Sequence, residues 1–158
     1  MNLHYLKPIF VIFLFIVFGN VSFAQSEKFD YNGHSIEISK KVIEHFGSDY
    51  IADIKVNNKD HLLYLNYFAE NTYIIEDLGI KASSSDIKNI SSLNKLAKSK
   101  ASDFDASDIS SFNIFAYGIQ PLTEQQVFKI EGSSNAIVVF SKTRFLKDYN
   151  AYRNALLK

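Results

Sequence analysis

The stretch HLLYLNYFAENTYIIE, residues His61–Glu76, decides the fold because its hydrophobic pattern changes half-way along. Its first half places apolar residues at the spacing of one helix face: Leu62, Leu65, Phe68 and Ala69. Thr72–Ile75 then consists of β-branched and aromatic residues, which favour a strand. The stretch therefore predicts a helix to about Glu70 followed by a short strand. A long hairpin is the alternative, because periodicity alone does not assign short apolar runs.

Upstream, the dipeptide Asn32-Gly33 separates two short alternating segments, Phe29–Tyr31 and Ser35–Ile38. Both central positions of a tight hairpin turn need positive φ, which Asn and Gly tolerate best. This pattern predicts an N-terminal β-hairpin.

Two short helices are expected between this hairpin and the central stretch. Ser39 can cap a helix over Lys40–Phe46, and Gly47 can end that helix in the left-handed conformation. Ser48–Val56 fits both a strand and a helix capped by Ser48, and we favour the helix. Asn58 can cap the helix that follows.

Downstream, Ile87–Ala97 has apolar residues every three or four positions, which predicts another helix, and the polar segment Lys98–Ser111 predicts a mobile loop. Three strands are expected next, over Phe112–Ile119, Gln126–Glu131 and Ala136–Phe140. Ser141 can then cap a final helix with one apolar stripe: Phe145, Tyr149, Tyr152 and Leu156. The fold class expected is α+β, with a small antiparallel sheet (the N-terminal hairpin plus a C-terminal three-stranded meander) packed against two or three helices.

The N-terminus has the order of a secretory signal peptide. Lys7 precedes the unbroken apolar run Ile9–Phe18, and Ser22 and Ala24 occupy the small positions before a cleavage site. A membrane span needs about 20 apolar residues, twice the length of this run. We therefore expect residues 1–24 to be a cleaved signal peptide, residues 25–158 to form a single domain, and no stable membrane span after cleavage. An uncleaved N-terminal anchor is the alternative.

Composition excludes several classes of protein. The 17 basic and 17 acidic side chains of the 158 residues balance, whereas a nucleic-acid-binding protein needs a basic face. The absence of Cys excludes disulfides, thiolate metal sites and thiol catalysis. The Lys, Asn, Ile and Phe bias is similar to that of exported proteins of AT-rich Gram-negative bacteria. We expect a periplasmic or secreted bacterial protein that does not bind nucleic acid.

No metal or cofactor motif is complete. Asp103, Asp105 and Asp108 resemble the start of a calcium loop, but Asp108 stands where the EF-hand turn needs Gly, and Ile114 stands where it needs Glu. An irregular calcium site on these three aspartates is the weaker alternative to a solvated loop. The histidines lack metal-ligand spacing, and no phosphate-binding glycine pattern is present. No cofactor is therefore expected.

Tyr67 and Asn71 lie four residues apart, so they share one face of the central helix. A tyrosine and an amide combine rigid area with adaptable hydrogen bonding, and they are our candidate binding residues for a glycan or a protein. The bland interpretation is that they fill the margin of the core.

No nucleophile motif is present, neither the G-x-S-x-G elbow nor S-x-x-K with its partner motifs. We therefore expect an exported, non-catalytic binding or assembly module of the bacterial cell envelope, with a protein or glycan partner outside the cytoplasm. The alternative is a small cell-envelope hydrolase with unidentified catalytic residues. A calcium-dependent module is a third hypothesis.

Overall fold

A computed structural model describes residues 26–77, 87–89, 109–130 and 133–158. They form an α+β fold, as predicted. The helices are α1 (Lys40–Phe46), α2 (Ser48–Asn57), α3 (Lys59–Asn71) and α5 (Lys142–Ala155), with short 3-10 helices η2 (Ile109–Ser111) and η3 (Ile114–Tyr117). The strands are β1 (Lys28–Tyr31), β2 (His34–Glu37), β3 (Tyr73–Asp77), β4 (Ile87–Asn89), β5 (Gln126–Lys129) and β6 (Asn135–Val139). Residues 1–24, which carry the predicted signal peptide, lie outside the described ranges.

The N-terminal hairpin forms as predicted. Strands β1 and β2 pair antiparallel, with Phe29 opposite Ile36 and Tyr31 opposite His34. Asn32 and Gly33 both have positive φ, 51° and 83°, which matches the two-residue turn that the dipeptide predicts.

The predicted helices after the hairpin are also confirmed. The Ser39 hydroxyl accepts a hydrogen bond from the backbone N–H of Lys41, which caps α1, and the Asn58 side chain accepts one from the N–H of His61, which caps α3. The stop at Gly47 differs from expectation. Its φ is positive at 82°, but its ψ of 154° is extended rather than left-handed. This conformation is accessible almost only to glycine, and it lets α2 begin at once, with Gly47 in place of Ser48 at the cap position.

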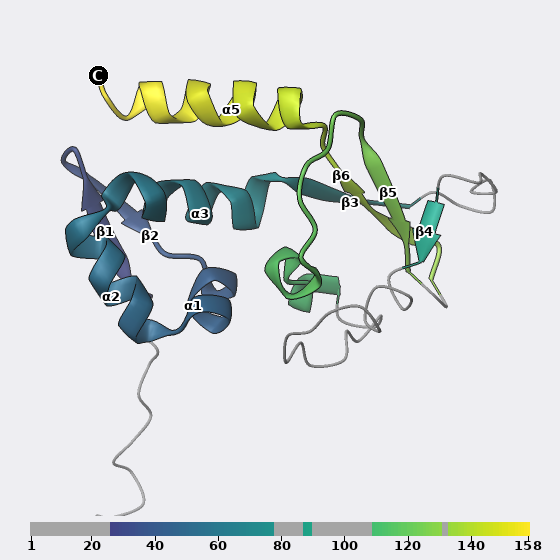
Figure 1. The fold of residues 1–158 in the computed structure, drawn as a ribbon, viewed down its shortest axis with the longest axis horizontal. Coiled ribbons are helices and arrows are strands. Elements are labelled where there is room, and N and C mark those ends of the chain that lie inside the picture. Colours follow the sequence, from purple (N-terminus) through teal and green to yellow (C-terminus); the bar gives the residue numbers. More distant parts are fainter. Residues whose placement is uncertain (1–25, 78–86, 90–108, 131–132) are drawn as a thin grey trace, which may run out of the picture.

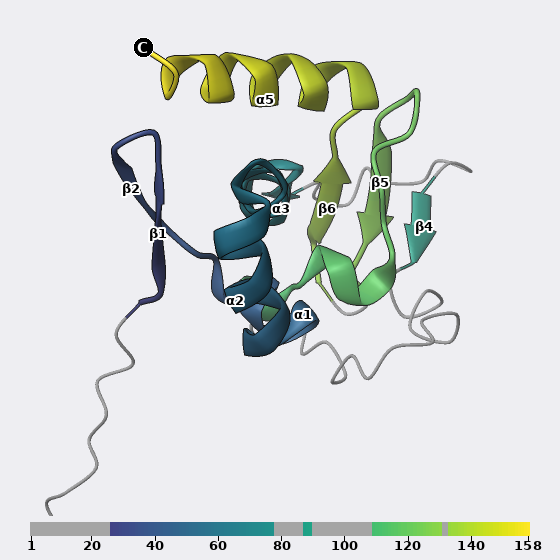
Figure 2. The ribbon, with the colours of Figure 1, turned by 60° about the vertical axis from the view of Figure 1, so that its left-hand side comes forward.

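The central stretch behaves as predicted, with α3 followed directly by β3. The second sheet has the strand order β3-β6-β5-β4, and its first three strands are antiparallel. Helix α3 leads into β3, and β6 leads into α5. Because β3 and β6 pair antiparallel, these two segments run in opposite directions. Figure 1 shows α3 in teal below α5 in yellow, and Figure 2, in which α3 is seen nearly end-on, shows α5 crossing above it.

Two segment predictions were wrong. Phe112–Ile119 is not a strand. It contains η3, because the Asn113 side chain accepts from the N–H of Phe115 and Gly118 ends the turn in the left-handed conformation. The third antiparallel strand is instead β3. The predicted helix over Ile87–Ala97 begins as strand β4, which pairs parallel with the edge of β5; residues 90–97 lie outside the described ranges.

Aromatic residues join the helical part of the core. Tyr64 of α3 contacts Tyr149 of α5 edge to face, with ring centroids 5.3 Å apart, and Phe68 contacts Phe145 in the same way at 5.5 Å. The predicted stripe on the final helix is therefore the face that packs on α3. Within the described residues, no helix has both the length and the apolar character needed to cross a membrane.

Candidate functional site

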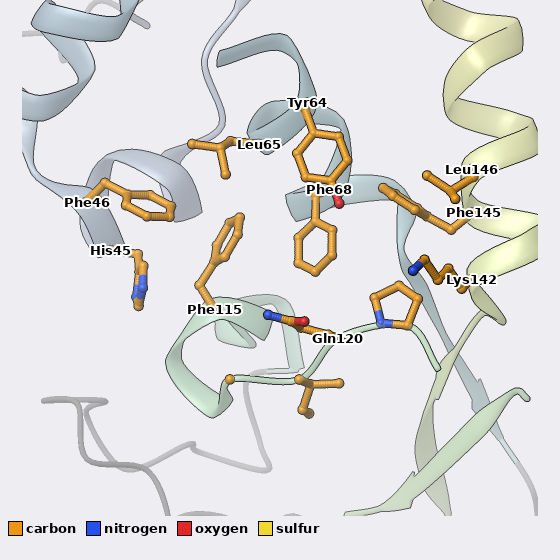
Figure 3. Close-up of a pocket in the computed structure, with 13 residues that line it drawn as sticks. His45, Phe46, Tyr64, Leu65, Phe68, Phe115, Gln120, Lys142, Phe145 and Leu146 are labelled. Carbon is orange, nitrogen blue, oxygen red and sulfur yellow. The ribbon is translucent and has the colours of Figure 1, made fainter. Parts of the chain in front are cut away.

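A pocket of about 490 Å³ opens between α1, α3, α5 and the loop after η3. Figure 3 shows its side chains converging from these four elements. The described residues that line it are His45, Phe46, Tyr64, Leu65, Phe68, Phe115, Gly118, Ile119, Gln120, Pro121, Lys142, Phe145 and Leu146. Its volume lies within the range of small-molecule sites.

Helical spacing supplies two walls of the pocket. Tyr64, Leu65 and Phe68 occupy positions i, i+1 and i+4 of α3, so they project from one side of that helix. Lys142, Phe145 and Leu146 occupy positions i, i+3 and i+4 in the first turns of α5, so they also project from one side of their helix. The facing walls of the pocket therefore come from segments about 75 residues apart in the sequence.

Hydrogen bonds from Asn113 hold the third wall in place. Its side-chain nitrogen donates to the backbone carbonyl of Lys41 in α1 at 2.9 Å, and its side-chain oxygen accepts from the N–H of Phe115 at 3.2 Å. One side chain thus joins η3 to α1 and directs Phe115 toward the pocket.

The aromatic rings of the pocket contact one another. Phe115 lies 5.2 Å from Phe68 and 5.2 Å from Phe46, measured between ring centroids, and Tyr64 meets Phe145 edge to face at 5.7 Å. Rings that pack on each other lose little further freedom when a ligand binds, so this wall is already ordered for binding.

Four polar side chains line the pocket: His45, Tyr64, Gln120 and Lys142. None of their side-chain polar atoms has a hydrogen-bond or ion-pair partner within the described residues. Figure 3 shows the Lys142 nitrogen turned toward Phe68 and the Gln120 amide near Phe115. The pocket therefore combines an apolar wall with donor groups that are free to meet a ligand.

Burial changes the proton affinity of two of these groups. Partial burial against the neighbouring rings lowers the pKa of His45, so its imidazole is neutral at neutral pH. Burial raises the pKa of Tyr64, so its phenol stays protonated. Lys142 is thus the cationic group of the described lining at pH 7.

The predicted binding residues Tyr67 and Asn71 do not line this pocket. The Tyr67 ring is half-buried and stacks on Tyr152 of α5, with centroids 4.9 Å apart. Asn71 is exposed, and its side-chain nitrogen donates to the backbone carbonyl of Tyr67 at 3.1 Å. Both lie on α3, and their binding role stays a prediction.

The calcium candidates Asp103, Asp105 and Asp108 lie outside the described residues, so this hypothesis stays open. In the described part of the chain, no three His, Asp or Glu side chains come together as a metal site would require.

A second hollow, of about 480 Å³, lies beside a polar cluster at the opposite end of α5. The Tyr31 phenol donates to the Asp60 carboxylate at 2.6 Å, and the Arg153 guanidinium meets the same carboxylate at 3.2 Å. These contacts tie β1, α3 and α5 together, so we assign this cluster a structural role.

The sequence did not group these residues into a site. Phe68 and Phe145 were expected on the apolar faces of two helices, and Phe115 was expected in a strand. The capping serine before α5 was the one local signal, because it places Lys142 in the first turn of that helix. Comparisons of the chain with protein-family models, curated proteins and solved structures find no significant match.

Proposed function

We propose that the protein is an exported, non-catalytic binding or assembly module of the bacterial cell envelope, and that the aromatic pocket is its binding site. The observation that carries this proposal is the convergence of five aromatic and four polar side chains on one pocket: Phe46, Tyr64, Phe68, Phe115 and Phe145, with His45, Gln120 and Lys142. Tyr64 belongs to both sets. The polar groups have no hydrogen-bond or ion-pair partner among the residues that the structure describes. Export rests on the N-terminal sequence, Ile9–Phe18 followed by Ser22 and Ala24.

The chemistry of the lining favours binding over catalysis. Among its described residues there is no carboxylate and no Ser, Thr or Cys side chain. Nucleophilic catalysis needs such a group within hydrogen-bond reach of a base, and His45 is the base that the pocket offers. A neutral imidazole beside a hydrophobic cavity is the observation that keeps a small cell-envelope hydrolase as the second candidate.

Site-specific photo-crosslinking in the native envelope tests the binding site. A benzophenone amino acid replaces Leu146, an exposed residue of the pocket lining, Gln125 on the exposed loop nearby, or Tyr67 on the helix face. We expect a discrete crosslinked product from position 146 and none from position 125. A product from position 67 alone would move the binding site to the Tyr67–Asn71 face, and no product from any position would contradict the proposal.

Two further measurements separate the alternatives. The N-terminal residue of the protein recovered from the envelope should be Gln25 if the signal is cleaved after Ala24, and Met1 at the N-terminus would contradict processing. Hydrolysis of nitrophenyl esters or glycosides that disappears in His45→Gln would establish the enzyme instead of the binding module.

A further inference from the structure

Lys142 stands at the end of α5 where the helix dipole does not favour a positive charge. Lys142 is the first residue of α5, whose N-terminal amides carry the positive end of the helix dipole. A cation is disfavoured there, and Ser141 already caps the helix by accepting from the N–H of Arg144. The lysine therefore does not stabilise its own helix.

Neighbouring charges do not compensate Lys142. Arg144, two residues on, lies over the Phe140 ring at 3.6 Å and pairs with Asp148 at 3.8 Å. Lys142 has no such partner within the described residues, and no acidic side chain is among those described at the pocket. The pocket therefore presents an exposed lysine, with no ion-pair partner among the described residues, beside an apolar wall.

We infer that the pocket binds an amphiphilic anion, a molecule with one carboxylate on an alkyl or aryl body, and this inference rests on the proposed function. The apolar body lies against Phe68, Phe115 and Phe145, and the carboxylate faces the Lys142 ammonium. The protonated Tyr64 phenol and the Gln120 amide are further donors for its oxygens. Aromatic faces also attract cations, but Lys142 repels a cationic ligand from the same space.

Two fluorescent probes with the same apolar body test the charge preference. Anilinonaphthalenesulfonate carries an anionic group, and N-phenylnaphthylamine lacks it. We expect the full-length protein, as isolated from the expressing cell, to bind the anionic probe about tenfold more tightly, a ratio typical of one hydrogen-bonded charge contact. Added salt should weaken binding of the anionic probe and leave the neutral probe unchanged.

Matched variants assign the effect to the pocket. Lys142→Gln should lower the affinity for the anionic probe about tenfold and change the affinity for the neutral probe less than about twofold. Lys147→Gln, which removes an exposed lysine further along α5, should change neither. Gln120→Trp should fill the pocket and abolish binding of both probes, whereas Gln125→Trp should leave binding of both probes intact. Decanoate should displace the neutral probe, and decylammonium should not.

The outcomes separate this inference from the proposed function. Equal affinity for the two probes, or an anionic-probe affinity unchanged by Lys142→Gln, overturns the anionic ligand and leaves the pocket as a binding site for neutral molecules. Binding of neither probe, or binding that Gln120→Trp leaves intact, overturns the pocket as a binding site as well.

Discussion

The imidazole of His45 stacks on the ring of Phe115, with ring centroids 5.4 Å apart and an interplanar angle of 22°. This contact joins α1 to the η3 segment in the lining of the pocket. It also removes part of the hydration of the imidazole, which lowers the pKa of His45.

This contact predicts a loss of stability in mild acid. The unfolded chain takes up a proton at the ordinary histidine pKa of 6.5, whereas folded His45 does so only at lower pH. The free energy of unfolding should therefore fall as the pH decreases from 7.5 to 5. His45→Gln should reduce that fall, and His34→Gln in the exposed hairpin serves as control. Urea unfolding at pH 7.5 and at pH 5 measures the free energy of unfolding. An equal decrease between the two pH values in His45→Gln and in the unchanged protein would contradict the prediction.

The Tyr31–Asp60 hydrogen bond predicts a loss of stability when the phenol oxygen of Tyr31 is removed. Tyr31 is buried, and its phenol donates to Asp60 at 2.6 Å. Tyr31→Phe should lower the free energy of unfolding by about 1 kcal/mol, because the ring packing stays while the hydrogen bond is lost. Tyr50→Phe is the matched control, since the Tyr50 phenol meets His61 at the exposed surface. An equal effect in both variants would exclude a special role for the cluster.

The same hydrogen bond predicts behaviour in strong acid. The Tyr31 phenol, and then Arg153, lower the pKa of Asp60 below its ordinary value of 3.8. A carboxylate of this kind stabilises the fold above the unfolded pKa, and the contribution is lost as the pH falls through the folded pKa. Asp60→Asn should therefore flatten the stability profile below pH 4, measured by urea unfolding at intervals down to pH 2.5. An unchanged dependence of stability on pH in Asp60→Asn would show that Tyr31 and Arg153 do not lower the pKa of Asp60.

Thr72 predicts a stabilising substitution. It links α3 to β3, is fully buried, and its hydroxyl has no hydrogen-bond partner within the described part of the chain. Thr72→Val keeps the branched shape and removes the unpaired group, so it should raise the free energy of unfolding by about 1 kcal/mol. Thr123→Val on the exposed loop should change stability less than about 0.5 kcal/mol. A destabilised Thr72→Val variant would indicate that the hydroxyl has a partner.

Tyr67 requires separate tests of stability and of binding. Its ring contacts Tyr149 and Tyr152, so Tyr67→Ala should lower the free energy of unfolding by about 2–3 kcal/mol through lost packing. Tyr67→Phe keeps the ring, and Asn71→Ala removes a surface hydrogen bond; each should cost less than about 1 kcal/mol. Loss of crosslinking to a partner in these two mild variants would support the predicted binding face. Loss in Tyr67→Ala alone would indicate unfolding.

Local features of the sequence predicted the elements that local chemistry controls. Asn32-Gly33 specifies its turn because few other residues adopt positive φ twice in succession. Ser39, Asn58 and Ser141 specify helix starts because each side chain satisfies an amide only a few residues away. These preferences act within one turn of the chain, so they were readable without the rest of the molecule.

Tertiary pairing decided what the sequence did not. Ile87–Asn89 reads equally well as a helix start, and it is a strand because the edge of β5 supplies its hydrogen-bond partners. Phe112–Ile119 has strand propensity, but β3 already occupies the place beside β6. A short segment with two locally acceptable conformations takes the one that its distant neighbours complete.

The sequence by itself determined the α+β class, the hairpin and the starts of three helices. Only the tertiary structure decided the pocket, because its walls come from four segments that the chain brings together on folding. Phe115 and Lys142 show the reason. Phenylalanine is common in protein cores and lysine is common on protein surfaces, so neither residue type indicates a site by itself. In the folded protein both line the same cavity.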